Sequence, residues 1–245
     1  MKIMHPKIRW LALGLALAAA LALAGCGKTS EGNTKIDRPT VQSAERQFAG
    51  PSAGDTIAIF DTSAGQFRAV LYPDLAPQAC ENFIGLAQGG YYNGLTFTRT
   101  ESGFVIGAGQ TADGQVTTLW NGKGYPVEAT DQLHHYSGAL CAATAEDGLG
   151  YSVFYVMQTL PGGLDQELTD QMTAQGYRQE VMDAYQAAGG APYLDYTDTV
   201  FGQVYEGMEV VDAIAQTQLQ TDESGQTTGV VTINSVTIAS YQPEG

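Results

Sequence analysis

Basic residues are scarce in this chain of 245 residues, which has 11 Lys and Arg against 26 Asp and Glu. The formal net charge of −15 repels nucleic-acid phosphates and anionic lipid headgroups. We therefore exclude nucleic acid as a partner. Acidity of this kind is typical of a well-solvated surface and by itself indicates no binding function.

Histidine and cysteine are also scarce, with three of each. The sequence has no His-Glu-x-x-His, no Cys-x-x-Cys and no cluster of three metal ligands, so we predict no metal site and no cofactor. His135 is interpreted as a structural residue near the start of a strand. Cys80 and Cys141 lie in apolar patterns, which predicts buried free thiols. A disulfide between them is the alternative, but two cysteines give no framework from which to infer it.

The N-terminus has the pattern of a targeting signal. Three basic residues precede an apolar run from Trp10 to Ala24, which is too short to span a membrane comfortably. The run ends in Leu-Ala-Gly-Cys at Cys26 and resembles the bacterial lipobox, in which that cysteine is lipidated, for example with palmitate. An ordinary signal peptide with a chance cysteine is the alternative. We predict a signal peptide over 1–25 and an extracytoplasmic protein anchored to the cell membrane by a lipid on Cys26.

The rest of the chain divides into a polar segment and a domain. Residues 26–54 carry small and polar side chains and few large apolar ones, which predicts a flexible tether. A domain is predicted over 55–242. Within it, apolar residues recur at helical spacing through 161–192, and glycines interrupt and end this pattern. This segment is predicted to be one kinked helix or a helical hairpin inserted between strands.

Short alternating segments dominate the domain. Strands are predicted over 56–60, 67–72, 95–99, 104–106, 139–143, 153–157, 201–205 and 231–240. Two framework helices are predicted over 78–87, after Pro77, and over 208–215. Many short strands with only two such helices indicate a mainly β fold, a closed antiparallel barrel capped by helices.

One cation in the domain has an unusual setting. Arg99 is predicted to share a strand face with Phe97, and an apolar segment from Phe104 to Ile106 follows closely. The alternative for this local pattern is a surface guanidinium that lies on apolar neighbours.

The order of the segments resembles the cyclophilin family of peptidyl-prolyl cis-trans isomerases. Residues 77–83, 90–99 and 103–109 are similar to its P-x-T-x-x-N-F, G-x-Y-x-G-x-x-F-H-R and G-F-x-x-Q-G-G. Residues 138–143 and 152–156 are similar to G-x-L-S-M-A and S-Q-F-F-I. Residues 194–212 are similar to L-D-G-x-x-x-V-F-G-x-V followed by G-M-x-V-V-D. The likeness runs in order from about residue 56 to 240, interrupted by the insert.

The resemblance implies a closed eight-stranded barrel with a helix at each end and an active groove on its outer face. It implies rotation about Xaa-Pro bonds of proline-containing polypeptides by a monomer without a cofactor, here assisting the folding of exported proteins. Arg99 occupies the family's arginine position and is the predicted catalytic residue. The predicted substrate-binding residues are Phe104, Val105, Ala143, Thr144, Phe154, Tyr155, Tyr193, Leu194 and Asp198.

Several positions depart from the family pattern. Family glutamines are replaced by Gly107 and Val153, an asparagine by Thr144, and a tryptophan by Tyr193. Thr98 and Asp198 stand where histidines are usual, and Asp198 is an alternative partner for the arginine. These departures leave a second hypothesis open, a catalytically weak peptide-binding protein of the same fold. A third hypothesis is an envelope lipoprotein whose insert docks a partner.

Overall fold

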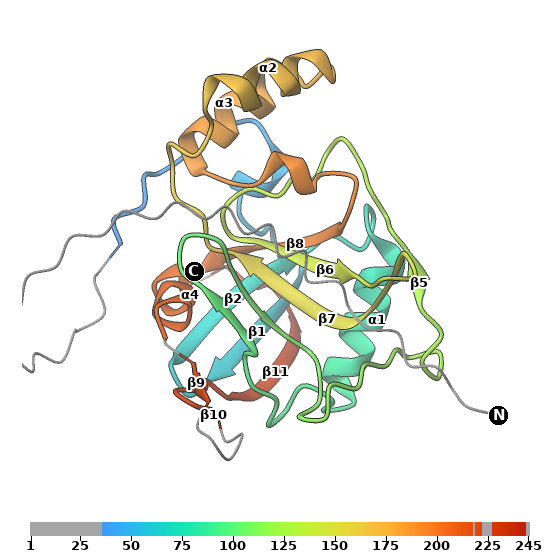
Figure 1. Cartoon of the computed structure of the whole chain (residues 1–245). Helices are drawn as coiled ribbons and strands as arrows, with labels where there is room; N and C mark the ends of the chain where they lie inside the picture. Colours follow the sequence, from blue (N-terminus) through green and yellow to red (C-terminus); the bar gives the residue numbers. More distant parts are fainter. Residues whose placement is uncertain (1–35, 218, 222–226, 244–245) are drawn as a thin grey trace, which may run out of the picture.

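One curled antiparallel β-sheet organises the computed structural model, which describes residues 36–217, 219–221 and 227–243 (Figure 1). The main strands are ordered β11-β1-β2-β8-β6-β7-β4-β3, and β5 pairs with β7 beside this path. Their bounds are β1 Thr56–Thr62, β2 Gly65–Leu71, β3 Arg99–Glu101, β4 Val105–Ala108, β5 Tyr125–Pro126, β6 Ala139–Thr144, β7 Leu149–Met157, β8 Thr199–Glu206 and β11 Ile233–Ser240. A separate ribbon pairs β9 (Gln220–Thr221) with β10 (Thr227–Thr228). The predicted mainly β, antiparallel architecture is confirmed.

The prediction of a closed barrel is wrong, because the curled sheet stays open between its two edge strands. In the part of the chain that the structure describes, no ladder joins β3 to β11. Near these strands, the chain meets at an isolated bridge, Thr96 with Thr232, and at backbone bonds such as Phe97 N to Val231 O at 2.9 Å and Ile233 N to Leu95 O at 2.8 Å. Most of the predicted strand 95–99 is irregular, so β3 is too short to complete a regular ladder.

Alternate residues of each strand face opposite sides of the sheet, which separates two apolar clusters. Phe154 and Val156 of β7 face the interior of the curl, where they join an aromatic core that includes Phe60 and Phe83. The Phe154 and Phe83 rings meet edge to face at 5.7 Å between centroids. Tyr155 belongs to the second cluster, on the opposite side of the sheet, which we call the outer face.

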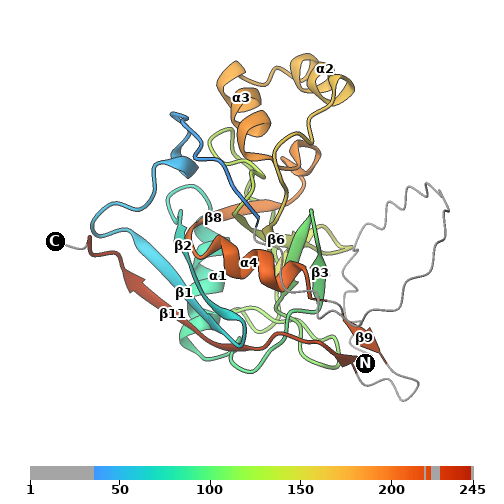
Figure 2. The same cartoon turned by 90° about the vertical axis from the view of Figure 1, so that its left-hand side faces the viewer.

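Two framework helices close the interior, as the sequence predicts. They are α1 (Pro77–Gln88) and α4 (Met208–Ala215). Phe83 of α1 and Ile214 of α4 both lie in the interior cluster. Figure 2 shows α4 lying across the curl beside β2 and β3. Apolar spacing of three to four residues therefore identified both helices from their buried faces.

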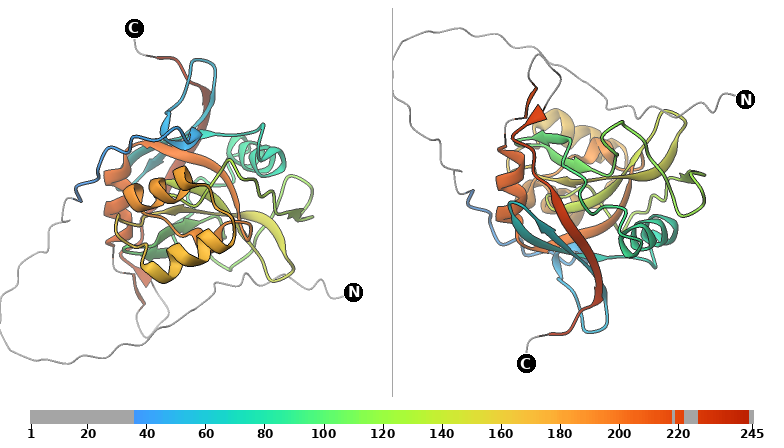
Figure 3. Two further views of the ribbon diagram at one scale, coloured as in Figure 1. Left: turned by 90° about the horizontal axis from the view of Figure 1, so that it is seen from above. Right: turned by 90° about the horizontal axis from the view of Figure 1, so that it is seen from below.

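The predicted insert is a helical hairpin, α2 (Gln166–Ala174) and α3 (Gln179–Ala188), and not one kinked helix. Gly176 adopts φ of 81° between them, a left-handed conformation that breaks the helix. The hairpin lies over one end of the sheet (Figures 1 and 3). Its buried side chains form a third cluster with Tyr136, and η2 (Pro192–Leu194) returns the chain to β8. Among the described residues, no helix has both the length and the apolar character to cross a membrane.

The predicted tether differs from the structure where the two overlap. Residues 36–54 lie along the domain and include a short helix, η1 (Arg46–Phe48). The buried Gln47 amide donates to His134 O and Gln203 Oε1, both at 2.9 Å. Polar composition predicted flexibility here, but specific hydrogen bonds hold this segment. The signal peptide, Cys26 and the rest of the tether lie outside the described residues.

Candidate functional site

Arg99 and Tyr155 lie in one row across three strands. Arg99 of β3 is opposite Gly107 of β4, and Gly107 is opposite Tyr155 of β7. Side chains in one such row point to the same face of a sheet. Gly107, the middle residue of the row, has no side chain. Arg99 and Tyr155, 56 positions apart in sequence, thus share the outer face.

The Arg99 guanidinium lies over an aromatic ring and beside a carboxylate. Its Cζ is 5.1 Å from the Phe104 ring centroid. Its Nε and Nη2 donate to the Glu101 carboxylate at 2.6 and 3.1 Å. The Arg99 side chain is 18% exposed and that of Glu101 is 50% exposed. Both residues line an open hollow between β3 and the end of α4, so the arginine is accessible from solvent.

An apolar surface adjoins the arginine on the outer face. Of the predicted substrate-binding residues, Val105, Ala143 and Tyr155 are buried in the outer cluster, with Phe104 and Leu194 half-buried against it. The structure therefore places these five in one cluster, from β4 and the residue before it, β6, β7 and η2. This arrangement suits the capture of a small apolar group at the rim.

Tyr193 extends this surface toward solvent. Its side chain is among the exposed large ones, at 60%. Partial burial raises the pKa of Tyr193, while the nearby charge of Arg99 lowers it.

Asp198 binds Tyr155 and Thr144. Its Oδ2 accepts from the Tyr155 hydroxyl at 2.7 Å, and its Oδ1 accepts from the Thr144 backbone N–H at 3.0 Å. Burial raises the pKa of Tyr155 well above its usual value, so the phenol remains a donor at neutral pH. Asp198 therefore fixes the outer end of the Tyr155 ring.

Two aromatic residues, Phe154 and Phe97, lie in the interior core and not on the outer face. Phe154 is predicted to bind substrate, but it lies inside the curl, because neighbouring residues of β7 face opposite sides. Phe97 is also in the interior core, so it does not share a face with Arg99 as predicted. The chain is irregular before β3, and the simple alternation expected for 95–99 fails there.

A buried carboxylate behind the site was not identified from the sequence. Asp195 accepts from His134 Nδ1 at 3.0 Å, and from His135 Nδ1 at 2.8 Å. The His135 ring stacks on Tyr155, with centroids 6.3 Å apart and planes at 17°. The sequence signals were the pair of adjacent histidines and the Leu-Asp of the family motif, and only the fold shows that both histidines bind the one carboxylate of Asp195.

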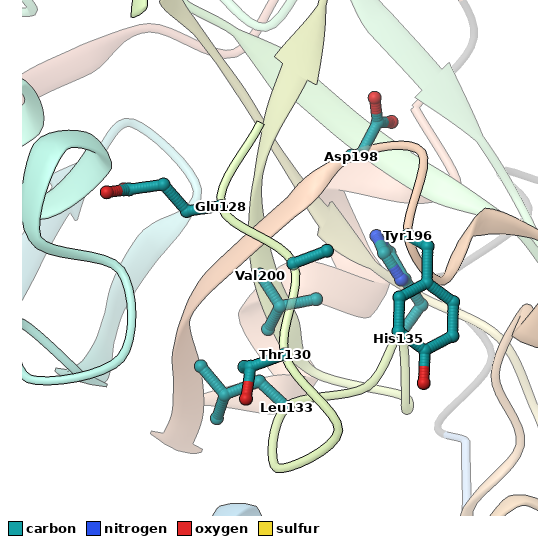
Figure 4. A pocket seen from close by; sticks show the side chains of 8 residues that line it. Glu128, Thr130, Leu133, His135, Tyr196, Asp198 and Val200 are labelled. Atoms are coloured by element: carbon teal, nitrogen blue, oxygen red, sulfur yellow. The ribbon is translucent and has the colours of Figure 1, made fainter. Parts of the chain in front are cut away.

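A small pocket lies beside this stack (Figure 4). Its lining comes from the chain before β6 and from the start of β8: Glu128, Ala129, Thr130, Leu133, His135, Tyr196, Asp198 and Val200. No group of three or more metal-binding side chains occurs in the part of the chain that the structure covers. Cys80 and Cys141 are buried free thiols, as predicted, and burial raises the pKa of Cys80 to about 12.

Comparison with known proteins gives one consistent result. Residues 57–238 match the family model described as cyclophilin type peptidyl-prolyl cis-trans isomerase/CLD. A Staphylococcus aureus protein named "Putative peptidyl-prolyl cis-trans isomerase" is 33% identical over 167 residues, which cover 68% of this chain and 84% of that protein. A Staphylococcus saprophyticus protein of the same name is 33% identical over 162 residues, covering 66% of this chain and 81% of that protein.

A solved structure is similar in fold. The cyclophilin type peptidyl-prolyl cis-trans isomerase of Cryptosporidium parvum, crystallised in the presence of the dipeptide Ala-Pro, matches with a TM-score of 0.56 and 19% sequence identity. The match covers 76% of this chain and 99% of that one. At this identity the likeness concerns the fold.

Proposed function

The chain belongs to the cyclophilin-type peptidyl-prolyl cis-trans isomerase family, and from this premise we propose that Arg99 and the apolar surface beside it form its active site. The observation that carries the proposal is the row Arg99, Gly107 and Tyr155 on the outer face, with Phe104 under the guanidinium. A donor thus lies beside an apolar surface able to hold a proline ring. Proline-containing polypeptides are the substrates.

The reaction needs no nucleophile. An Xaa-Pro bond resists rotation because its amide is conjugated, with a barrier of about 18–20 kcal/mol. A hydrogen bond from Arg99 to the prolyl nitrogen favours the pyramidal nitrogen of the twisted transition state. That bond stabilises the transition state more than either planar form, and so lowers the barrier. Phe104, Val105, Tyr155 and Leu194 hold the proline ring.

Glu101 is the immediate competitor for the guanidinium. An ion pair with a half-exposed carboxylate contributes about 0–1 kcal/mol. A bound peptide therefore displaces it at little cost. The same pair supports the second candidate, a protein that binds proline peptides with weak catalysis, because Glu101 occupies the donors that catalysis uses.

One assay separates the two candidates. Isomerisation of a proline test peptide is followed by NMR exchange with the full chain and with Arg99→Ala. We expect catalysis by the wild type and a loss of about a hundredfold or more in the variant, the size typical of a lost transition-state donor. Arg68→Ala is the matched control, since Arg68 lies on β2 and pairs with Glu206. Peptide binding without rate enhancement by the wild type would instead establish the second candidate.

The envelope role is also proposed. The basic start, the apolar run and Cys26 support export and lipid anchoring at the cell membrane, where the enzyme would act as a monomer on exported proteins. Labelling of cells with a palmitate analogue is expected to mark the wild type and to leave Cys26→Ala unmarked. Equal labelling of both proteins would contradict the anchor.

A further inference from the structure

The carboxylate of Asp195 joins the helical insert to the chain that precedes β6. The insert contributes two phenols: Tyr177 donates to Oδ2 at 3.0 Å, and Tyr185 lies 2.9 and 2.8 Å from the two oxygens. His134 and His135 approach from the other side. The Asp195 side chain is 2% exposed, so its charge depends on hydrogen bonds from these four residues for the solvation that water would otherwise supply.

His135 carries this connection to the active-site surface. Its backbone N–H and its Nδ1 both contact Asp195 Oδ1, at 3.0 and 2.8 Å. Its Nε2 is buried and makes no hydrogen bond to the described residues. The face of the His135 ring stacks on Tyr155, and Figure 4 shows His135 among the side chains that line the adjacent pocket. Since Asp195 accepts two hydrogen bonds from His135, one from the backbone and one from the ring, the orientation of the stacked ring is fixed.

Two walls of the site depend on this arrangement. Tyr155 is held at its ring face by His135 and at its hydroxyl by Asp198. Leu194 precedes Asp195 directly, in the short helix whose last turn is closed by the bond from Asp195 N to Pro192 O at 3.1 Å. A shift of the carboxylate would move both apolar walls together.

We propose that Asp195 and His135 are positioning residues through which the insert sets the shape of the proline-binding surface. The inference rests on the proposed site and assigns the insert a role in substrate binding. It differs from docking of a partner, because the phenols act from the inner side of the hairpin. Neither positioning residue touches the substrate.

The test removes the two phenol hydroxyls and keeps the rings. In the full chain, Tyr177→Phe combined with Tyr185→Phe is expected to raise KM about tenfold, with kcat within about twofold, because the surface binds the proline ring in ground and transition states alike. Tyr136→Phe is the matched control. The ring centroids of Tyr136 and Tyr185 are 4.5 Å apart. The Tyr136 hydroxyl has no partner among the described residues, so removal of this hydroxyl should leave KM unchanged.

A second readout does not depend on activity. The NMR signals of the Tyr155 ring should shift in the double variant and in His135→Phe, which keeps a ring and the backbone bond to Asp195 but loses the side-chain bond. They should stay fixed in Tyr136→Phe. Unchanged KM and unchanged Tyr155 signals in a folded double variant would overturn the inference. If the Tyr155 signals move while Arg99→Ala keeps full activity, the connection stands and the proposed site fails.

Discussion

At the scale of single residues, the site combines phenols whose pKa is raised with a carboxylate whose pKa is lowered. Burial raises the pKa of Tyr155 and Tyr185, so both stay protonated and serve as donors. For Asp195, burial alone would raise the pKa, but hydrogen bonds from His134 and His135 outweigh it and lower the value below 3.8. The buried carboxylate is therefore ionised and the phenols around it are neutral, which is the pairing that their hydrogen bonds require.

This difference predicts a pH dependence of stability. Because the folded pKa of Asp195 is lowered, its contribution is fully present above the ordinary value of 3.8 and is lost as the pH falls below it. We expect Asp195→Asn to lower the free energy of unfolding by about 1–3 kcal/mol near neutral pH, and by less as the pH approaches about 3. Urea unfolding of both proteins over this range measures the difference. A difference that is constant with pH would contradict the assignment.

At the scale of elements, the sequence predicted the helices and strands whose apolar residues recur at a regular spacing. The strands that form β1, β2 and β6, and both framework helices, lie within a few residues of their predicted bounds. Local signals also placed Pro77 in the first turn of α1. These local signals did not reveal which group caps the N-terminus of α1. Ala76 has no capping side chain, and the Glu128 carboxylate accepts from Gln78 N and Ala79 N at 3.0 and 2.9 Å instead.

The predictions that failed depend on contacts between distant segments. Whether the sheet closes depends on how residues 95–98 meet 231–233, and no pattern within either segment encodes that geometry. For the candidate site too, local patterns predicted some residues, and contacts between distant segments decided the others. The motif around Arg99 predicted the arginine and its apolar neighbours, whereas the partner of each histidine depends on where η2 places Asp195. Alternation would have put Phe154 and Tyr155 on opposite faces, but only the fold shows that Tyr155 shares the outer face with Arg99.

At the scale of the whole molecule, the segment before β1 joins parts that are distant in sequence. Glu45 accepts from Arg178 of the insert at 2.8 Å. Arg38 donates to Asp212 of α4 and, through Nη1, to Ser137 Oγ at 2.7 Å and to Thr159 O at 3.0 Å. The segment thus contacts the insert, the sheet and a framework helix, so the folded unit begins well before the predicted boundary at residue 55.

The ion pair between Arg38 and Asp212 tests this extension of the folded unit. The Asp212 side chain is 5% exposed, and removal of its cation would leave a buried charge with Gln158 as a remaining donor. We expect Arg38→Ala to lower the free energy of unfolding by about 3 kcal/mol, the cost of breaking a buried pair. Arg46→Ala on the same segment is the control, because Arg46 and Asp74 are 43% and 56% exposed and their pair contributes about 0–1 kcal/mol. Urea unfolding compares the two variants. Equal, small losses of unfolding free energy in the two variants would mean that the segment is a tether. A larger loss in Arg38→Ala would make the segment part of the folded domain.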